Sequence, residues 1–197
     1  MKILKNIFVL AFFFCILTNN SWSKSASEFI SSLSIEASNI LSSKLSDDEK
    51  IIRLKEIGEQ SVDIKGVGLY TLGKYRKTLT DNQKEQYEKL FKDYFLKSFS
   101  GRLVGYTDAK IAVLSEEIKN EKYTIVYSKL IGTSDRPEVK IDWRVYTKDP
   151  QKPLIRDLVI EGLSLARTQK EEFNSIIANN DGSIEALFEN LNRFLEN

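Results

Sequence analysis

The hydrophobic pattern changes its period near residue 108, and this change restricts the fold more than any other feature of the sequence. Between Asp108 and Gly162 apolar side chains alternate with polar ones, most clearly over Val139–Val145. Alternation with a period of two is typical of a strand with one buried face. Runs rich in β-branched residues predict three neighbouring strands over Lys110–Ile118, Lys122–Ile131 and Leu154–Glu161. Short polar turns join the runs, so the region predicts a twisted antiparallel sheet of about four sequential strands.

Two capping boxes mark the beginnings of helices before this region. Ser46–Glu49 places a hydroxyl residue three positions before a glutamate, and Thr80–Gln83 repeats the arrangement with a glutamine. Apolar residues at helical spacing follow each box. The sequence therefore predicts helices that run from these boxes to about Gln60 and Ser100.

Weaker patterns predict the remaining helices. An apolar stripe interrupted by serines predicts a helix over 25–43, and helical spacing returns after Gly162 and again from Ile184. Residues 62–79 carry three of the nine glycines and predict short helical turns and loops without much regular length. Amphipathic helices flanking one antiparallel sheet predict an α+β domain.

The helix predicted over 81–100 carries five aromatic rings and one leucine on a single wide face: Tyr87, Leu90, Phe91, Tyr94, Phe95 and Phe99. Such a face either packs in a core or forms the wall of a ligand cavity. Two observations favour a cavity. Tyrosines suit the mouth of a pocket, where one end of the ring stays wet. The strand over Leu154–Glu161 also has apolar residues on both faces, which predicts a sheet covered on both sides there.

The N-terminal residues predict a signal peptide over 1–23. Lys2 and Lys5 precede an apolar run over Ile7–Leu17, which is about half the length of a membrane-spanning helix. Small residues follow, so we expect cleavage before Lys24 and an exported mature domain over 24–197. The bulky Phe14 before the cysteine argues against a lipoprotein signal.

Composition restricts the function of the mature chain. Removal of the leader takes two of 29 basic residues, none of 28 acidic residues, and the only Cys, which leaves a charge of −1. A balanced charge argues against a nucleic-acid partner. The mature chain would have neither His nor Cys, so it would lack an imidazole base, a thiolate and the usual zinc ligands. We therefore expect no catalytic residues and no metal site.

Two patterns suggest catalysis but have simpler explanations. Gly162–Ala166 resembles a nucleophile elbow, yet no His can activate Ser164, which is expected to cap the following helix. Asp157 and Glu161 alternate to one face of a strand and could form a proton-transferring pair. The simpler explanation is a strand edge whose carboxylates are solvated or paired with arginines, for which Arg102, Arg156 and Arg167 are the available partners.

Two stretches carry a family resemblance. The first runs from Leu72–Arg76 through Phe91 to Arg102–Tyr106, and the second is Asp157–Leu165. In these motifs, and in length, order of elements and leader, the chain resembles the MlaC family, periplasmic phospholipid-binding components of a lipid-transport system that maintains outer-membrane asymmetry. It departs from the family at Arg76, where the family places an aromatic residue.

The resemblance implies an NTF2-like sheet with a helical subdomain around a deep apolar cavity that takes acyl tails and leaves the headgroup at the mouth. It divides the domain into an N-terminal helical part (24–62), the sheet (108–162) and C-terminal helices (163–197). It implies a non-enzymatic periplasmic carrier, expected to be a monomer, with phospholipid as cargo rather than cofactor. Its partners would be an inner-membrane ABC transporter complex carrying an MCE-domain ring and an outer-membrane lipoprotein–porin complex.

The predicted cavity wall combines the aromatic helix, the first motif and the apolar side of the sheet: Leu69, Leu72, Tyr75, Tyr94, Phe95, Phe99, Leu103, Tyr106, Ile141, Trp143, Val145, Leu158, Ile160, Leu163 and Leu165. Two other functions stay open at this point. One is a small periplasmic hydrolase or isomerase that uses Asp157 or Glu161 with a Tyr hydroxyl. The other is a periplasmic adaptor that binds only proteins.

Overall fold

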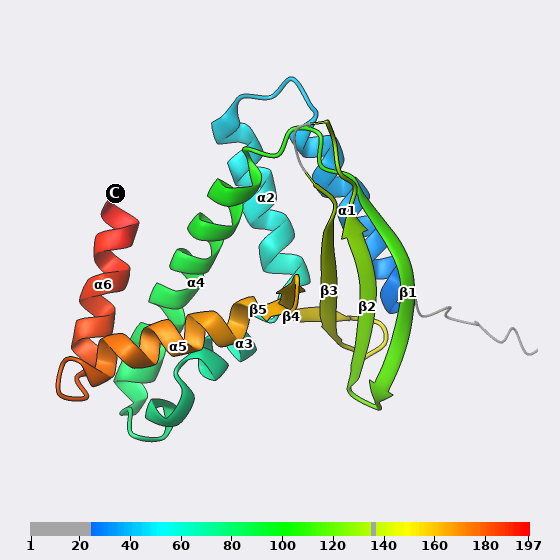
Figure 1. Ribbon diagram of the computed structural model, residues 1–197. Helices are drawn as coiled ribbons and strands as arrows, with labels where there is room; N and C mark the ends of the chain where they lie inside the picture. Colours follow the sequence, from blue (N-terminus) through cyan, green and yellow to red (C-terminus); the bar gives the residue numbers. More distant parts are fainter. Residues whose placement is uncertain (1–24, 135–136) are drawn as a thin grey trace, which may run out of the picture.

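A computed structural model describes residues 25–134 and 137–197 (Figure 1). The predicted leader over 1–23 lies outside the described residues. Within the described part, no helix combines the length and apolarity needed to cross a membrane.

The helices are α1 (Ala26–Leu41), α2 (Asp47–Ser61), α3 (Ile64–Thr71), α4 (Asp81–Leu103), α5 (Leu165–Ala178) and α6 (Ile184–Glu196), with a 3-10 helix η1 (Gly73–Lys77). Both predicted capping boxes are confirmed, because Ser46 and Thr80 each exchange hydrogen bonds with the third residue of their helix. The backbone amide of Arg167 also donates to the Ser164 hydroxyl, which confirms Ser164 as the cap of α5.

One of the short helical turns predicted over 62–79 is a longer, regular helix. Residues 62–79 contain α3, an eight-residue helix that begins where Asp63 accepts a hydrogen bond from the amide of Gly66. Its second glycine serves packing, since a Cβ at Gly68 would lie 2.7 Å from the ring of Phe91 on α4. The glycines that suggested loops therefore allow two helices to approach closely.

The strands are β1 (Ile111–Asn120), β2 (Tyr123–Leu130), β3 (Val139–Tyr146), β4 (Leu154–Ile160) and β5 (Leu163–Ser164), and they form one antiparallel sheet in sequential order. This confirms the predicted α+β class. The prediction of about four strands omitted β5, whose two residues pair with the end of β4.

A bulge decides which side chains of β4 face inward. The register with β3 shifts beside Arg144, so that Ile155 lies opposite Val145 while Leu158 lies opposite Trp143. An extra residue reverses the alternation, which brings Ile155 and Leu158 to the same face of the sheet. β4 therefore has apolar residues on both faces, as predicted, but Leu154 and Ile155 exchange the faces that simple alternation gives them: Ile155 joins Leu158 and Ile160, and Leu154 joins Val159.

The described residues form two hydrophobic cores. The helical core lies among α3, α4, α5 and α6, and the sheet core lies between α1 and the sheet. In Figure 1 these cores correspond to the helical part and to the curved sheet with α1 behind it. Three half-buried side chains contact both cores: Ile64, Val67 and Phe95.

Candidate ligand-binding site

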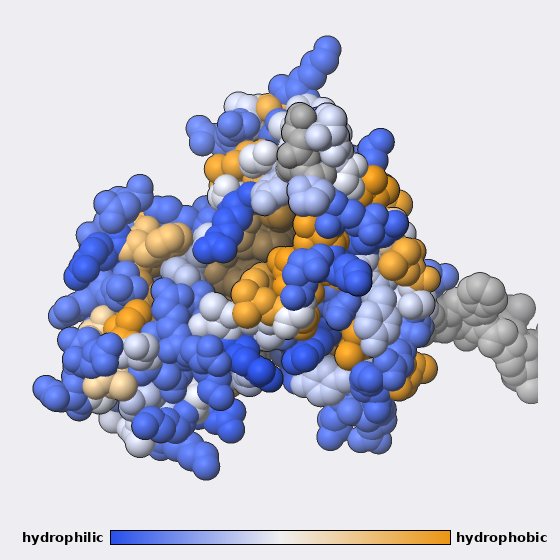
Figure 2. Space-filling view, in the orientation of Figure 1, coloured by the Kyte–Doolittle hydropathy of each residue, from blue (hydrophilic) through white to orange (hydrophobic). Residues whose placement is uncertain are grey.

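An apolar hollow opens between the two cores. Figure 2 shows it at the centre of the visible face, bordered by hydrophilic residues. It exists because α1 packs mainly on β1 and β2, while α4 packs on α2, α3 and α6 rather than on the sheet. On the inner face of β3, β4 and β5, which we call the sheet wall, the side chains of Ile141, Trp143, Val145 and Ile155 are buried in the sheet core, while Leu158 and Ile160 are half-buried and Leu163 is exposed. Phe95 of α4 packs against the same core.

The sheet wall consists of rows of paired side chains. Ile141 lies opposite Ile160, which lies opposite Leu163, and directly opposed residues in antiparallel strands share a face. Exposure rises along this row from 9% at Ile141 to 59% at Leu163. With Trp143, Val145 and Leu158 in the adjacent rows, the structure brings all six predicted strand and β5 residues to one face.

The buried polar groups of this wall already have hydrogen-bond partners within the protein. The indole nitrogen of Trp143 donates to the Ser128 hydroxyl at 2.8 Å, and that hydroxyl donates to the carbonyl of Ile141 at 2.9 Å. Across residues 25–134 and 137–197, every buried side-chain nitrogen or oxygen has a hydrogen-bond partner. The sheet wall therefore offers a ligand apolar area rather than specific hydrogen bonds.

The C-terminal half of α4 supplies the opposite wall. The rings of Phe95 and Phe99 stack at 5.7 Å with 9° between their planes. A Cβ at Gly58 would lie 3.3 Å from the ring of Phe99, so this glycine lets α2 pack closely behind the aromatic pair. Half-buried Phe95 and Phe99 thus present aromatic surface beside the hollow, supported by α2.

The N-terminal half of the aromatic face belongs to the helical core instead. Tyr87 is fully buried, and its hydroxyl shares a 2.8 Å hydrogen bond with the Thr71 hydroxyl. Burial raises the pKa of Tyr87 far above its usual range. Tyr94 donates to Gln169 at 2.9 Å. Tyr87 therefore lies in the core and not at the mouth of a pocket, where tyrosines were expected.

The remaining predicted wall residues are dispersed. Leu72 is buried in the helical core with half-buried Tyr75 against it, Leu69 and Leu103 are half-buried on α3 and α4, and Tyr106 and Leu165 are 41% and 39% exposed. Contacts of all fifteen residues with a ligand stay predictions. Ile64 and Val67 were missed, although Asp63 before an apolar pair spaced by three residues is a signal for a capped helix.

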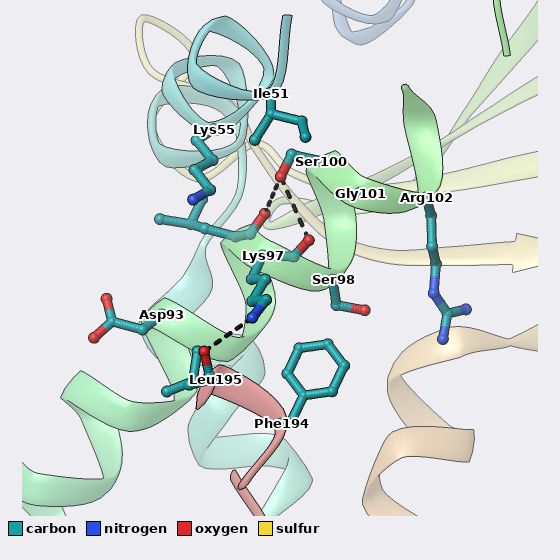
Figure 3. A pocket seen from close by; sticks show the side chains of 11 residues that line it. Ile51, Lys55, Asp93, Lys97, Ser98, Ser100, Gly101, Arg102, Phe194 and Leu195 are labelled. Carbon is teal, nitrogen blue, oxygen red and sulfur yellow. Dashed lines mark hydrogen bonds between the residues drawn. The ribbon is translucent and has the colours of Figure 1, made fainter. Parts of the chain in front are cut away.

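A groove of about 860 Å³ surrounds the C-terminal half of α4 on the side of α2 and α6 (Figure 3). Its lining combines apolar, small and charged residues, with three cationic side chains and one acidic side chain: Ile51, Lys55, Asp93, Leu96, Lys97, Ser98, Ser100, Gly101, Arg102, Phe194 and Leu195. The ammonium of Lys97 donates to the carbonyl of Leu195 at 2.9 Å, which fastens the end of α6 to α4.

Asp157 and Glu161 do not act as a pair in this structure. The Asp157 carboxylate accepts hydrogen bonds from the Ser164 hydroxyl at 2.7 Å and from the Ala166 amide at 3.0 Å. Glu161 follows the end of β4 with φ of 48° and accepts from the amide of Lys140. Each carboxylate has its own partners, and Asp157 fastens the start of α5 to the sheet.

The arginine partners proposed from the sequence were wrong. Arg144, on the neighbouring strand, lies 3.4 Å from the Asp157 carboxylate. Arg156, the extra residue of the bulge, instead contacts Asp63 at 2.6 Å and ties the beginning of α3 to the sheet. The register shift explains the exchange, because it places Arg144 directly opposite Asp157.

A single antiparallel sheet that faces helices across an apolar hollow defines a class of small α+β proteins able to enclose an apolar ligand. The family model described as "MlaC protein" matches residues 32–193. The chain therefore belongs to the MlaC family, as its motifs indicated.

A solved structure has the same fold. The phospholipid-binding protein from Ralstonia solanacearum, determined in complex with a phospholipid, superposes with a TM-score of 0.73 at 18% sequence identity. The alignment covers 88% of this chain and 98% of that chain. At this identity the likeness shows a shared fold.

Proposed function

We propose that this protein binds phospholipid and carries it across the periplasm. The observation that carries the proposal is the hollow between the inner face of β3–β5 and the Phe95–Phe99 pair, whose sheet wall offers apolar area and satisfied polar groups. Membership of a family of periplasmic lipid-binding carriers supports the same function, as does the phospholipid held by the Ralstonia solanacearum protein.

Free-energy arithmetic explains why such a carrier is needed. At about 0.8 kcal/mol per CH₂, exposing two tails of roughly sixteen carbons to water costs on the order of 25 kcal/mol. Free phospholipid therefore crosses an aqueous compartment at a negligible rate. A hollow that replaces water with Trp143, Leu158 and Phe99 around the tails removes most of this cost.

The remaining parts of the proposal concern location and partners. We infer that residues 1–23 direct export and that the mature protein exchanges lipid with two membrane complexes. One is an inner-membrane ABC transporter complex with an MCE-domain ring, and the other is an outer-membrane lipoprotein–porin complex. Because tails are recognised by apolar area, we expect weak selectivity among headgroup alcohols.

Native mass spectrometry followed by solvent extraction tests the proposal. Protein purified from the periplasm should carry one equivalent of phospholipid, with headgroups in about the proportions of the host membrane. An empty, unreactive protein would support a protein-only adaptor, and accumulation of cleaved lipid would support a hydrolase. Either result contradicts the carrier proposal.

A further inference from the structure

The wall formed by α4 continues into a polar segment on the same face. Phe95, Ser98, Phe99 and Arg102 follow one another at positions i, i+3, i+4 and i+7, the spacing of residues on one face of a helix. The two aromatic rings and the two polar side chains therefore share one stripe. Seven residues correspond to about 10 Å along the helix axis, so apolar and polar groups lie within reach of a single amphiphilic ligand.

Both polar side chains of this stripe have free donors. Figure 3 shows Arg102 extending from α4 toward α5, with Ser98 about one turn before it on the same side. Neither side chain forms a hydrogen bond or ion pair with another residue of 25–134 or 137–197. A hydroxyl and a guanidinium on successive turns can together bind a group with several acceptor oxygens.

No carboxylate of residues 25–134 or 137–197 forms an ion pair with the Arg102 guanidinium. Arg102 and Glu172 both act on the Tyr94 phenol, whose pKa is raised by burial and by Glu172 and lowered by Arg102. The Glu172 carboxylate accepts a hydrogen bond from Gln169 at 2.9 Å. Lys97, a nearby cation of the groove, is occupied by the Leu195 carbonyl.

We propose that Ser98 and Arg102 bind the phosphate of a phospholipid whose tails contact Phe95 and Phe99. This inference rests on the function proposed above and adds a chemical requirement to it. A phosphodiester is common to all phospholipids, so the contact selects phosphate-bearing lipids over neutral diacyl lipids without selecting the headgroup alcohol. Arginine suits this contact because its planar donors match phosphate oxygens.

Binding of lipids that share the diacylglycerol part, with and without a phosphate-bearing headgroup, tests the inference. Vesicles of phosphatidylethanolamine and phosphatidylglycerol supply the phospholipid, and the same vesicles doped with labelled diacylglycerol supply the neutral lipid. Arg102→Gln should weaken phospholipid binding about tenfold, which corresponds to about 1.4 kcal/mol, near the lower end of what a hydrogen bond to a charged group contributes. Diacylglycerol binding should not change. Arg102→Lys should recover part of the affinity, and Ser98→Ala should lower it about threefold.

Arg76→Gln is the matched control, since Arg76 is an exposed residue of η1 outside the stripe and loses the same charge. Equal phospholipid binding by wild type, Arg76→Gln and Arg102→Gln would overturn the phosphate assignment and leave the carrier function standing. Equal losses for phospholipid and diacylglycerol would also overturn it, because they would indicate damage to the wall. A wild type that bound neither lipid would refute the carrier function itself.

A soluble anion separates a lipid phosphate from a free phosphate. Millimolar inorganic phosphate should displace less than a tenth of the bound phospholipid, because it lacks the apolar area that holds the tails. Tight binding of inorganic phosphate that Arg102→Gln abolishes would instead assign the pair to a free anion, and would overturn the proposal.

Discussion

Leu158→Glu tests the sheet wall most directly. Leu158 is half-buried on the inner face of β4, directly opposite Trp143 and packed against the sheet core. Full burial of a leucine contributes about 1.5–3 kcal/mol, so losing this half-buried side chain should lower the free energy of unfolding by about 1 kcal/mol. Without ligand, the new carboxylate reaches water through the hollow.

A bound acyl chain changes that situation, because it displaces the water that solvates the carboxylate. The inner-face neighbours Trp143, Ile155 and Ile160 are apolar and offer no cation. Burying an unpaired charge costs several kcal/mol. Taking about 3 kcal/mol as a lower bound, the affinity for phospholipid should fall at least 100-fold.

Mass spectrometry of lipid extracted from the purified variant measures this loss, and thermal unfolding measures the change in stability. Ile125→Glu is the matched control, because Ile125 is also half-buried but lies opposite Arg144 on the outer face of the sheet. That variant should keep its lipid. A Leu158→Glu protein that carried as much phospholipid as wild type would refute the assignment of β4 as a wall.

Three further changes test the packing around the hollow. Phe95→Ala should lower the free energy of unfolding by about 2–3 kcal/mol in a denaturant titration, because Phe95 contacts both cores; a loss below 1 kcal/mol would contradict that role. The raised pKa of Tyr87 predicts stability that is fully present below about pH 10, where unfolded tyrosine ionises, and that falls by up to about 1.4 kcal/mol per pH unit above it. Tyr87→Phe should flatten this slope between pH 9 and 11, and an unchanged slope would argue against buried Tyr87 as its source. Asp157→Ala removes the acceptor for Ser164 and for the amide of Ala166 and should cost about 2–3 kcal/mol. Hydrogen exchange at that amide should accelerate, and unchanged protection would show that the carboxylate does not fasten α5.

Signals contained within a few residues predicted the structure best. The boxes at Ser46 and Thr80 define helix starts because both partners lie within one turn. The length of α3 was underestimated for the opposite reason. The need for a glycine at position 68 is explained only by the contact of Gly68 with Phe91, twenty-three positions later in the chain. No local sequence pattern predicts that contact.

The faces of β4 could not be predicted from residue types. Alternation assigns Ile155 and Leu158 to opposite faces, and only the bulge beside Arg144 brings them together. The same shift sets the ion pairs, since it places Arg144 opposite Asp157 and leaves Arg156 to reach Asp63. A one-residue register change thus determined both the wall and the error in the proposed arginine partners.

The aromatic face of α4 shows why the sequence could predict a face but not its division into core and wall. All 23 residues of α4 follow one helical period, yet the surroundings change along the axis as the two cores diverge. Tyr87 is enclosed by the helical core, Phe99 faces the hollow beside α2, and Arg102 extends beyond both into solvent. Mutational effects should divide in the same order. Changes near Tyr87 should affect stability alone, changes at Phe99 should affect both stability and lipid content, and changes at Arg102 should affect lipid binding alone. Helical periodicity cannot predict this order, because it gives the direction of a side chain around the helix axis and not its position along the axis.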